Sequence, residues 1–364
     1  MEKQRPFARR SPSRIEVSLL WLFAAILFVV TLVHFRSYSS MVANYGDNGS
    51  YLQAANAIRH WNFKGVEVKQ FWGLSYMIAA ISWLPIPPQW CLLVICTVSS
   101  LASVLMAWQL WGPWIAGFFT LLNFVWLQVS LLGGSESLFV ALLFASFLAI
   151  RKDRWAAGSI LAALATTVRP LGILGLFGIG LALISLRNYK KAILCTTLST
   201  VIGVLYLLPF WIYFHDPLYQ LHRYKQADWN SESVIGLPLH AIVVSLLHNR
   251  EPWTNVLLTM GWVVVAVAGL CAMGSKTFRP YIREHRAEYI FAFLYLGFIL
   301  TYNSVEWARA EFPRFVIPVM PFLLLSFDRW LPRSRYVLYG LCIVSPVLAA
   351  FSAIGIRNVL PALR

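Results

Sequence analysis

The sequence predicts an all-α membrane protein, a polytopic bundle of transmembrane helices that forms a single domain over residues 1–364. Hydrophobic residues make up 59% of the chain and charged residues only 12%, with a mean hydropathy of +0.65, which excludes a soluble globular domain. Eleven apolar stretches follow one another, and most are long enough to cross a hydrocarbon core of about 30 Å as helices. Lys and Arg gather in short clusters between these stretches, so the net charge of +15 indicates orientation in a bilayer and no nucleic-acid partner.

The N-terminus predicts a cytoplasmic arm, residues 1–16, followed by an uncleaved first span at 17–35. The basic residues of this arm are Lys3, Arg5, Arg9, Arg10 and Arg14. No small-residue cleavage site follows the long apolar run, as a signal peptide would require. The five cysteines lie inside or at the edge of apolar runs without metal-like spacing, so we expect small core residues and no metal site.

The apolar runs and the basic loops together place the other spans. They are predicted near 90–110, 113–132, 135–150, 155–168, 171–186, 192–214, 253–273, 288–304, 314–330 and 335–355. Basic loops at 151–154, 187–191, 276–286 and 329–335 then share the cytoplasmic side with the arm. This topology predicts an integral protein of a bacterial cytoplasmic membrane, with loops 36–89, 215–252 and 305–314 on the external side.

Two short segments decide this topology. Residues 71–84 are apolar, but 14 residues rise only about 21 Å as a helix, and a span there would invert every later basic loop. We therefore expect residues 36–89 to form a large external loop with amphipathic or re-entrant helices. The ranges 155–168 and 171–186 predict a hairpin around Arg169, whose tip reaches a water-filled cavity because an arginine facing lipid is costly.

Asp47 is the first candidate for chemistry. Residues 45–51 read YGDNGSY and precede a helix-like stretch at 50–61 that has Tyr51 on its apolar face. Helix capping explains part of this pattern, because Asp and Ser are standard N-cap residues. Ser50 can cap the helix, which would leave Asp47 free for a catalytic role, and both interpretations stay open.

Glu136 and Arg169 are the next candidates. Residues 133–139 read GGSESLF at the outer start of a span, where the helix dipole favours a carboxylate by a few tenths to about 1 kcal/mol. The glycine pair before Glu136 indicates close approach of a backbone or a ligand. Arg169, in TTVRPLG, is a functional candidate because ionisable residues at membrane depth are costly and usually serve a function.

Two further external stretches complete the set. One begins at His215 and Asp216 and leads to an expected interfacial helix near 236–248. The other reads EWARAEFPRF over residues 306–315 and contains Glu306, Arg309 and Arg314. A local ion pair between Glu311 and Arg314 is the alternative to a functional role here, and exposed pairs of this kind contribute at most about 1 kcal/mol.

The order of these motifs resembles that of the GT-C superfamily of integral-membrane glycosyltransferases. The shared features are GDNGSYL in an external loop, a following FWGLSYM stretch, then SESLF, TVRPLG and PRFVIPVMP. Together they cover nearly the whole chain. SESLF, HDPL followed by Gln226 and Trp229, and PRFVIP are most similar to bacterial relatives of the glycosylphosphatidylinositol mannosyltransferase II family.

The resemblance implies a hexosyltransferase. It would move one sugar, mannose or similar, from a polyprenyl- or dolichyl-phosphate donor to a hydroxyl of a lipid, glycan or protein, at the external face and with inversion. Asp47 then matches the general base, Arg169 and Arg314 match positions that hold the lipid phosphate, and Glu136 matches a second acidic position. The residues expected to contact substrate are Tyr51, His215, Asp216, Glu306 and Arg309.

No cofactor is implied. Many relatives carry paired acids where this chain has Asp47 followed by Asn48, which argues against a dedicated metal site but leaves a divalent ion open. The chemistry is consistent with the resemblance, because a phosphate leaving group needs a bidentate cation and a hydroxyl nucleophile needs a carboxylate.

Two other classes compete with this interpretation. A transporter or flippase of lipid-linked sugars predicts inverted repeats and charges in mid-span, and the sequence shows neither. A structural or assembly protein would leave an arginine at a hairpin tip and three outward carboxylate motifs unexplained.

Overall fold

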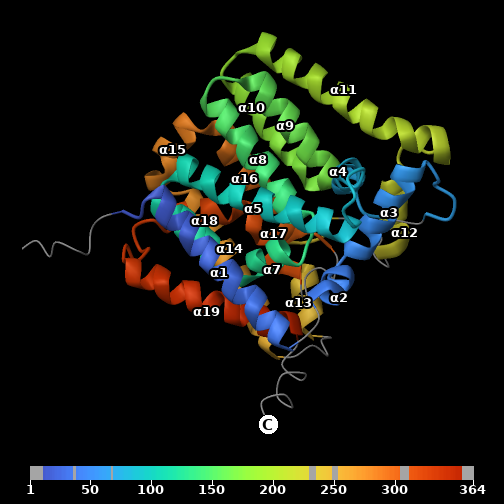
Figure 1. The fold of residues 1–364 in the computed structure, drawn as a ribbon. Helices are drawn as coiled ribbons and strands as arrows, with labels where there is room; N and C mark the ends of the chain where they lie inside the picture. The colour runs from blue at the N-terminus through green and yellow to red at the C-terminus, as the bar shows by residue number, and fades with distance from the viewer. Residues whose placement is uncertain are drawn as a thin grey trace, which may run out of the picture.

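The computed structural model describes residues 11–35, 38–66, 69–228, 235–247, 253–303 and 311–354. Within these ranges the chain is helical and contains no β-strand, which confirms the all-α class (Figure 1). In order, the α-helices are α1 (Arg14–Phe35), α2 (Tyr38–Asn44), α3 (Asn48–His60), α4 (Gly73–Ile81), α5 (Pro88–Trp111), α6 (Pro113–Leu121), α7 (Phe124–Leu131), α8 (Glu136–Arg151), α9 (Trp155–Val168), α10 (Ile173–Ser185), α11 (Tyr189–Phe214), α12 (Tyr219–Asp228), α13 (His240–Leu247), α14 (Trp253–Met273), α15 (Arg279–Glu284), α16 (Arg286–Thr301), α17 (Phe312–Val316), α18 (Met320–Ser326) and α19 (Arg335–Ile354).

Several helices have the length and composition of membrane spans. Five of the described helices (α1, α5, α11, α14 and α19) are long and apolar enough to cross a bilayer, or six spans if the bent pair α6 and α7 counts as one. The chain is therefore built as a membrane protein. The larger count of eleven spans, which includes shorter helices such as α9 and α10, stays a prediction.

The range 113–132, predicted as one straight span, is two helices in the structure. α6 and α7 meet at an angle of 73°. Asn123 explains the break, because its side-chain oxygen accepts a hydrogen bond from the Val125 N–H at 3.2 Å and starts a new helix. Its amide nitrogen donates to the Pro313 carbonyl at 2.8 Å, which fixes the bend against α17.

The range 314–330 also departs from the predicted single helix. It is divided into α17, a 3-10 turn at Ile317–Val319 and α18. Pro313, Pro318 and Pro321 each stand in the first turn of one of these pieces, where the missing N–H costs nothing. The repeated restarts turn this segment toward α8 and bring Arg314 into the protein interior.

The predicted hairpin around Arg169 is present. α9 ends at Val168, a 3-10 turn covers Pro170–Gly172, and α10 follows and packs against α9. Arg169 is extended, with φ −142° and ψ 132°, because a following proline disfavours the helical region. Gly172 allows the tight return, since a Cβ there would lie 2.5 Å from the Thr166 backbone nitrogen.

The first external loop was predicted to carry short helices, and α3 and α4 occupy it. α4 has nine residues, a rise of about 13 Å, which is too short to cross a bilayer. α3 and α4 pack against each other, and α4 lies directly on the end of α9, because a Cβ on Gly73 would lie 2.7 Å from Thr167. These contacts bring the first loop to the hairpin tip.

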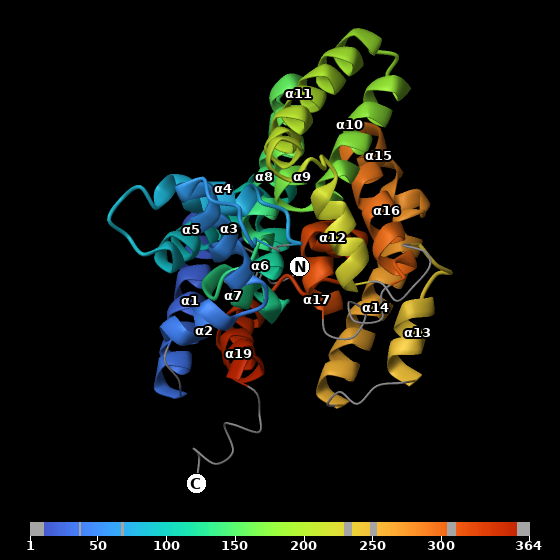
Figure 2. The ribbon, with the colours of Figure 1, turned by 90° about the vertical axis from the view of Figure 1, so that its right-hand side faces the viewer.

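α8 lies in the centre of the molecule and packs against α5 and α9. Its buried Phe147 contacts the rings of Phe291 on α16 and Phe322 on α18. α11 lies at the edge instead, next to α10, and presents Ile193, Val204, Trp211 and other apolar side chains outward (Figures 1 and 2). In a membrane such a surface faces lipid.

Ionic clusters occupy both ends of α8. Glu136 begins the helix, and Arg151 ends it with two hydrogen bonds to the buried Glu288 at 2.6 and 2.8 Å. The Tyr281 hydroxyl donates to Glu288 at 2.5 Å and accepts from the Trp111 indole at 2.8 Å. This second cluster joins α5, α8, α15 and α16 and is internally satisfied, so it is structural.

Candidate functional site

The glycine pair before Glu136 shapes the start of α8. Gly133 and Gly134 have φ of +108° and +141°, a region that side chains other than glycine rarely adopt. A Cβ would lie 2.6 Å from the Asn48 side chain at Gly133 and 2.6 Å from Glu136 Oε2 at Gly134. The glycine pair was predicted to allow close approach of a backbone or a ligand, and the structure instead places the side chains of Asn48 and Glu136 against it.

Glu136 lies between two arginines. Its Oε1 accepts a hydrogen bond from Arg169 Nη1 and forms an ion pair with Arg314 Nε, and its side chain is 1% exposed. A lone buried carboxylate or guanidinium would be strongly unfavourable, so the three groups stabilise one another. This burial fits a counter-ion that organises the two arginines better than a group that reaches a substrate.

Arg314 holds three carboxylates at once. Besides Glu136, its Nη1 donates to Glu311 Oε2 at 2.6 Å, and its Nη2 lies 3.9 Å from Asp47 Oδ2. The local pair with Glu311, considered as an alternative from the sequence, is thus present together with a longer-range role. A Cβ on Gly46 would lie 3.7 Å from Arg314 Nη1, so the guanidinium passes directly beside the Asp47 loop.

Arg169 keeps more of its hydrogen-bonding capacity. It contacts Glu136 and, at 3.4 Å, Ser135, and its guanidinium lies over the Phe315 ring at 5.2 Å. Within the described ranges its Nε and Nη2 make no hydrogen bond, and the side chain is 13% exposed. A guanidinium has five N–H donors, so Arg169 retains donors for an anion.

Asp47 occupies the N-cap position of α3 without acting as a cap. Its side chain makes no capping hydrogen bond; Oδ1 instead accepts from Gln70 Nε2 at 2.9 Å. The carboxylate side chain is 41% exposed, in contrast to Glu136. The expectation that Ser50 caps this helix is wrong, because α3 begins at Asn48 and Ser50 lies within its first turn.

Asn48 has a structural position. It is buried, and its amide nitrogen donates to the carbonyls of Val42 and Leu132 at 2.6 and 2.7 Å. These bonds tie the start of α3 to the segment before α8. In the part of the chain that the structure describes, no group of three or more His, Cys, Asp and Glu side chains is placed to hold a metal ion.

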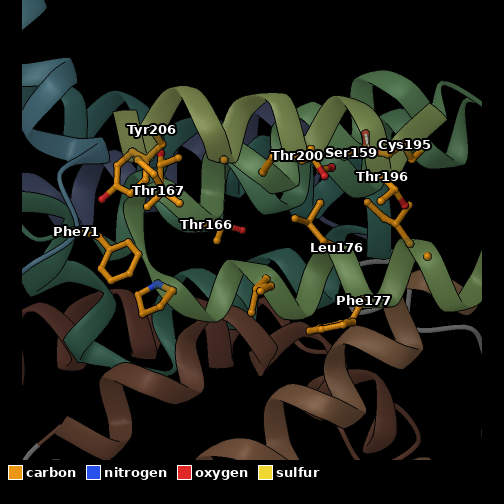
Figure 3. Close-up of a pocket in the computed structure, with 18 of the residues that line it drawn as sticks. Phe71, Ser159, Thr166, Thr167, Leu176, Phe177, Cys195, Thr196, Thr200 and Tyr206 are labelled. Carbon is orange, nitrogen blue, oxygen red and sulfur yellow. Dashed lines mark hydrogen bonds between the residues drawn. The ribbon is translucent and has the colours of Figure 1, made fainter. Parts of the chain in front are cut away.

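An apolar groove of about 860 Å³ lies beside this cluster, between α9, α10 and α11 (Figure 3). At one end are Phe71, Tyr206 and Thr167, and at the other are Cys195 and Thr196 (Figure 3). Thr166, Thr167 and Pro170 line the groove and flank Arg169 in the sequence. The charged cluster thus lies across the hairpin turn from one end of an apolar groove.

The structure brings four of the predicted site residues together: Asp47, Glu136, Arg169 and Arg314. Tyr51 is buried near them in α3, where its carbonyl accepts a hydrogen bond from Ser75. His215 and Asp216 stand apart, at the turn after α11. Asp216 binds the Leu218 N–H at 3.0 Å and His222 at 2.7 Å, as a residue that stabilises a turn does. Glu306 and Arg309 lie outside the described residues.

The sequence interpretation missed Gln70, Gln220 and Tyr206. The Gln220 amide donates to the Gln70 carbonyl at 2.7 Å, and the Tyr206 hydroxyl donates to Gln220 Oε1. Neither glutamine belongs to a recognisable motif, because the contacts join positions 150 residues apart. Only a burial pattern in three dimensions identifies them.

The chain was compared with protein-family models, with curated proteins and with solved structures, and none of the three comparisons found a match.

Proposed function

We propose that this protein is a polyprenyl-phosphate-sugar-dependent glycosyltransferase of the GT-C type, with eleven spans and its active site on the external face of a bacterial cytoplasmic membrane. The observation that carries the proposal is the position of an apolar groove beside a cluster of two arginines and an accessible carboxylate. A lipid-phosphate sugar has the matching chemistry, with a long apolar tail, an anionic phosphate and a reactive anomeric carbon.

The groove suits the lipid tail. Its volume is within the range of about 300–1,000 Å³ typical of ligand pockets, and it lies between helices with outward apolar surfaces. The surface of the groove is mostly apolar, with small hydroxyl side chains such as Ser199 and Thr200 on α11. A branched isoprenoid chain can enter such a groove sideways from the bilayer.

Arg169 suits the phosphate. In the reaction the bond between the anomeric carbon and the phosphate oxygen breaks, and the electron pair leaves with the polyprenyl phosphate. An arginine stabilises that charge bidentately and cannot lose its own proton at physiological pH. Arg314, held by three carboxylates, contributes positive charge while fixing Asp47 and Glu136 in place.

Asp47 suits the general base. The acceptor hydroxyl attacks the anomeric carbon from the face opposite the phosphate, which inverts the configuration, and its proton passes to the Asp47 carboxylate. A base must lie within hydrogen-bond reach of that hydroxyl, which excludes the buried Glu136. Asp47 and Glu311 are both exposed, but Glu311 accepts a hydrogen bond from Arg314 at 2.6 Å, whereas Asp47 lies 3.9 Å from that arginine. Gln70 and Arg314 hold it from two sides.

A transfer assay tests the proposal. Purified protein in lipid nanodiscs is given undecaprenyl-phosphate mannose labelled in the sugar, with octyl mannoside as acceptor, and the glycosylated product is counted. We expect transfer by the wild type and a loss of roughly 10²-fold or more in kcat for Asp47→Asn, because the amide keeps the shape but accepts no proton. Full activity of Asp47→Asn would exclude the proposed base.

A lipid flippase is the second candidate, and the length of the groove favours it. A further cavity of about 350 Å³ shares Ile184 and Thr196 with the groove, so the apolar path extends along α10 and α11. A flippase would move undecaprenyl-phosphate mannose across a vesicle membrane without consuming it. Vesicles that show movement of the intact donor and no sugar transfer would favour this alternative.

A further inference from the structure

Gln70 joins the proposed base to the groove. It lies between α3 and α4 and is 4% exposed. Its side-chain nitrogen donates to Asp47 Oδ1 at 2.9 Å, and its backbone carbonyl accepts from Gln220 Nε2 at 2.7 Å. One residue therefore contacts the catalytic candidate with its side chain and a groove residue with its backbone.

The orientation of the Gln70 amide is fixed by charge. Only the NH₂ end can face a carboxylate, since the oxygen end would be repelled. Gln70 Oε1 is consequently directed elsewhere, where it is buried and accepts no hydrogen bond from the residues that the structure describes.

The loop that carries Gln70 is anchored to the helices of the groove. The Tyr206 hydroxyl accepts a hydrogen bond from the Trp72 N–H at 3.0 Å and donates to Gln220 Oε1. Before the loop, the Val66 carbonyl accepts from the Tyr219 hydroxyl at 3.0 Å. Tyr206 and Gln220 also line the groove, so a lipid tail there would touch the side chains that hold the loop.

We propose that Gln70 is a positioning residue, which orients the Asp47 carboxylate and is itself held by Gln220 and Tyr206 in the wall of the groove. This inference rests on the proposed function, because it requires Asp47 to be the base. It adds that the side chains that hold the Gln70 loop, Tyr206 and Gln220, are themselves part of the groove wall.

Gln70→Glu tests the contact with Asp47. The substitution keeps the size of the side chain but replaces the donor with a second carboxylate, and a like charge disfavours ionisation of the base. We expect the acid limb of the kcat profile for transfer from undecaprenyl-phosphate mannose to octyl mannoside to move up by about one pH unit or more. Gln53→Glu, which adds the same charge at an exposed position of α3, should leave the profile in place.

Tyr206→Phe tests the anchor. It removes the hydroxyl that holds Trp72 and Gln220 while keeping the ring in the groove. We expect kcat to fall by roughly tenfold, with the KM for the donor within about twofold of the wild type, because misplacement of a reacting group slows turnover more than binding. A changed donor KM with unchanged kcat would assign Tyr206 to tail binding alone and overturn the anchoring.

Binding of undecaprenyl phosphate to each variant, measured without sugar or acceptor, separates misfolding from a catalytic effect. A Gln70→Glu protein that binds normally and keeps the wild-type pH profile would overturn the inference. If that variant fails to fold, the kcat of Tyr206→Phe decides alone. If the wild type transfers no sugar, the proposed function itself is refuted. If the wild type is active, Asp47→Asn is inactive and Gln70→Glu behaves like the wild type, only the role of Gln70 is refuted.

Discussion

Arg169 and Arg314 share Glu136 but differ in their other partners. Arg314 is enclosed by Glu136, Glu311 and Asp47, while Arg169 stacks on Phe315 and keeps unused donors among the described residues. The sequence placed both arginines in the phosphate site on equal terms. Their contacts favour Arg169 as the group that binds phosphate and Arg314 as the group that organises the acids.

The two Arg→Lys variants distinguish these roles. We expect Arg169→Lys to weaken binding of undecaprenyl phosphate by roughly tenfold, since an ammonium loses the planar fork and the stacking on Phe315. Arg314→Lys should affect stability and kcat more than phosphate affinity, because lysine cannot hold three carboxylates. Calorimetry with undecaprenyl phosphate and thermal unfolding measure the two effects, and equal affinity losses in both variants would contradict the division of roles.

Glu136→Gln tests whether Glu136 is the counter-ion of Arg169 and Arg314. With the negative charge removed, Arg169 would lose the carboxylate it pairs with, while Arg314 would keep only Glu311 and Asp47, and breaking a buried ion pair costs about 3–5 kcal/mol. We expect a large loss of thermal stability, against a small one for Asp47→Asn at the exposed carboxylate. If Glu136→Gln is as stable as the wild type but has a much lower kcat, Glu136 is a catalytic residue and not a counter-ion.

For single residues, the sequence indicated which side chains belong to the site but did not determine what each of them does. Asp47 was recognised because it is a polar residue before a helix, and two explanations, cap or base, were equally consistent with that pattern. The structure argues against the cap, because the side chain binds Gln70 and makes no capping hydrogen bond, and the role as base stays a prediction. Gln70 itself carried no signal, since a single uncharged glutamine in a polar loop resembles any other.

Among the secondary-structure elements, the hairpin of α9 and α10 with α11 forms the groove. Gly203 on α11 lines the groove, and a Cβ there would have no protein atom within 4 Å. A larger side chain at this position can therefore start into the groove without a clash at its Cβ. Gly261 on α14 also faces open space and provides a matched position away from the groove.

Gly203→Phe should weaken binding of undecaprenyl phosphate by roughly tenfold or more, because the ring occupies volume that the tail would fill. Gly261→Phe makes the same change in another apolar helix and should bind like the wild type. Affinity measured by calorimetry in nanodiscs compares the two. Equal binding by both variants would place the lipid tail elsewhere.

The junction of α15 and α16 should respond to pH. Burial lowers the pKa of His285 below its usual 6.5, with Arg151 adding to this and Glu288 and Glu284 opposing it. The folded protein therefore binds fewer protons than the unfolded chain at pH values just below 6.5. The free energy of unfolding is then unaffected by this group above pH 6.5, and it decreases as the pH falls from 6.5 through the lower pKa of the folded protein. His285→Asn should therefore show a smaller decrease in melting temperature over that window than the wild type, and identical decreases would assign the pH response to other groups.

The ends of some helices could be predicted from the sequence, because residues close to them in the chain stop a helix. Other helix ends were missed, because they depend on contacts with distant residues. The hairpin at Arg169 was predicted from two short apolar runs that flank Arg169 and Pro170 and from the parity of the basic loops. The breaks at Asn123 and at Pro318 were overlooked because the surrounding residues are apolar enough to read as continuous spans. An apolar run measures how much chain can lie in lipid, and it does not report whether the backbone is straight.

For the whole molecule, α8 sets the distance between the two ionic clusters. Glu136 and Arg151 are its first and last residues, and its 16 residues rise about 24 Å. Each cluster gathers helices from distant parts of the chain, which no local pattern could predict. The basic loops of the sequence predict that the first cluster lies at the external face and the second at the cytoplasmic face. Labelling can test this orientation.

Cysteine labelling in intact cells tests this orientation. In a Cys271→Ser background, which removes the exposed cysteine of the described ranges, we place single cysteines at Lys64 in the first loop and at Lys152 after α8. A membrane-impermeant maleimide should label Lys64→Cys from outside, and should label Lys152→Cys only after the membrane is opened, because polar loops on opposite faces are separated by the bilayer. Labelling of both positions from outside would mean that an even number of spans separates them, and not the three predicted at 90–110, 113–132 and 135–150. Labelling of Lys152→Cys alone from outside would mean that the protein has the opposite orientation. The cluster that contains Asp47 and Arg169 would then face the cytoplasm.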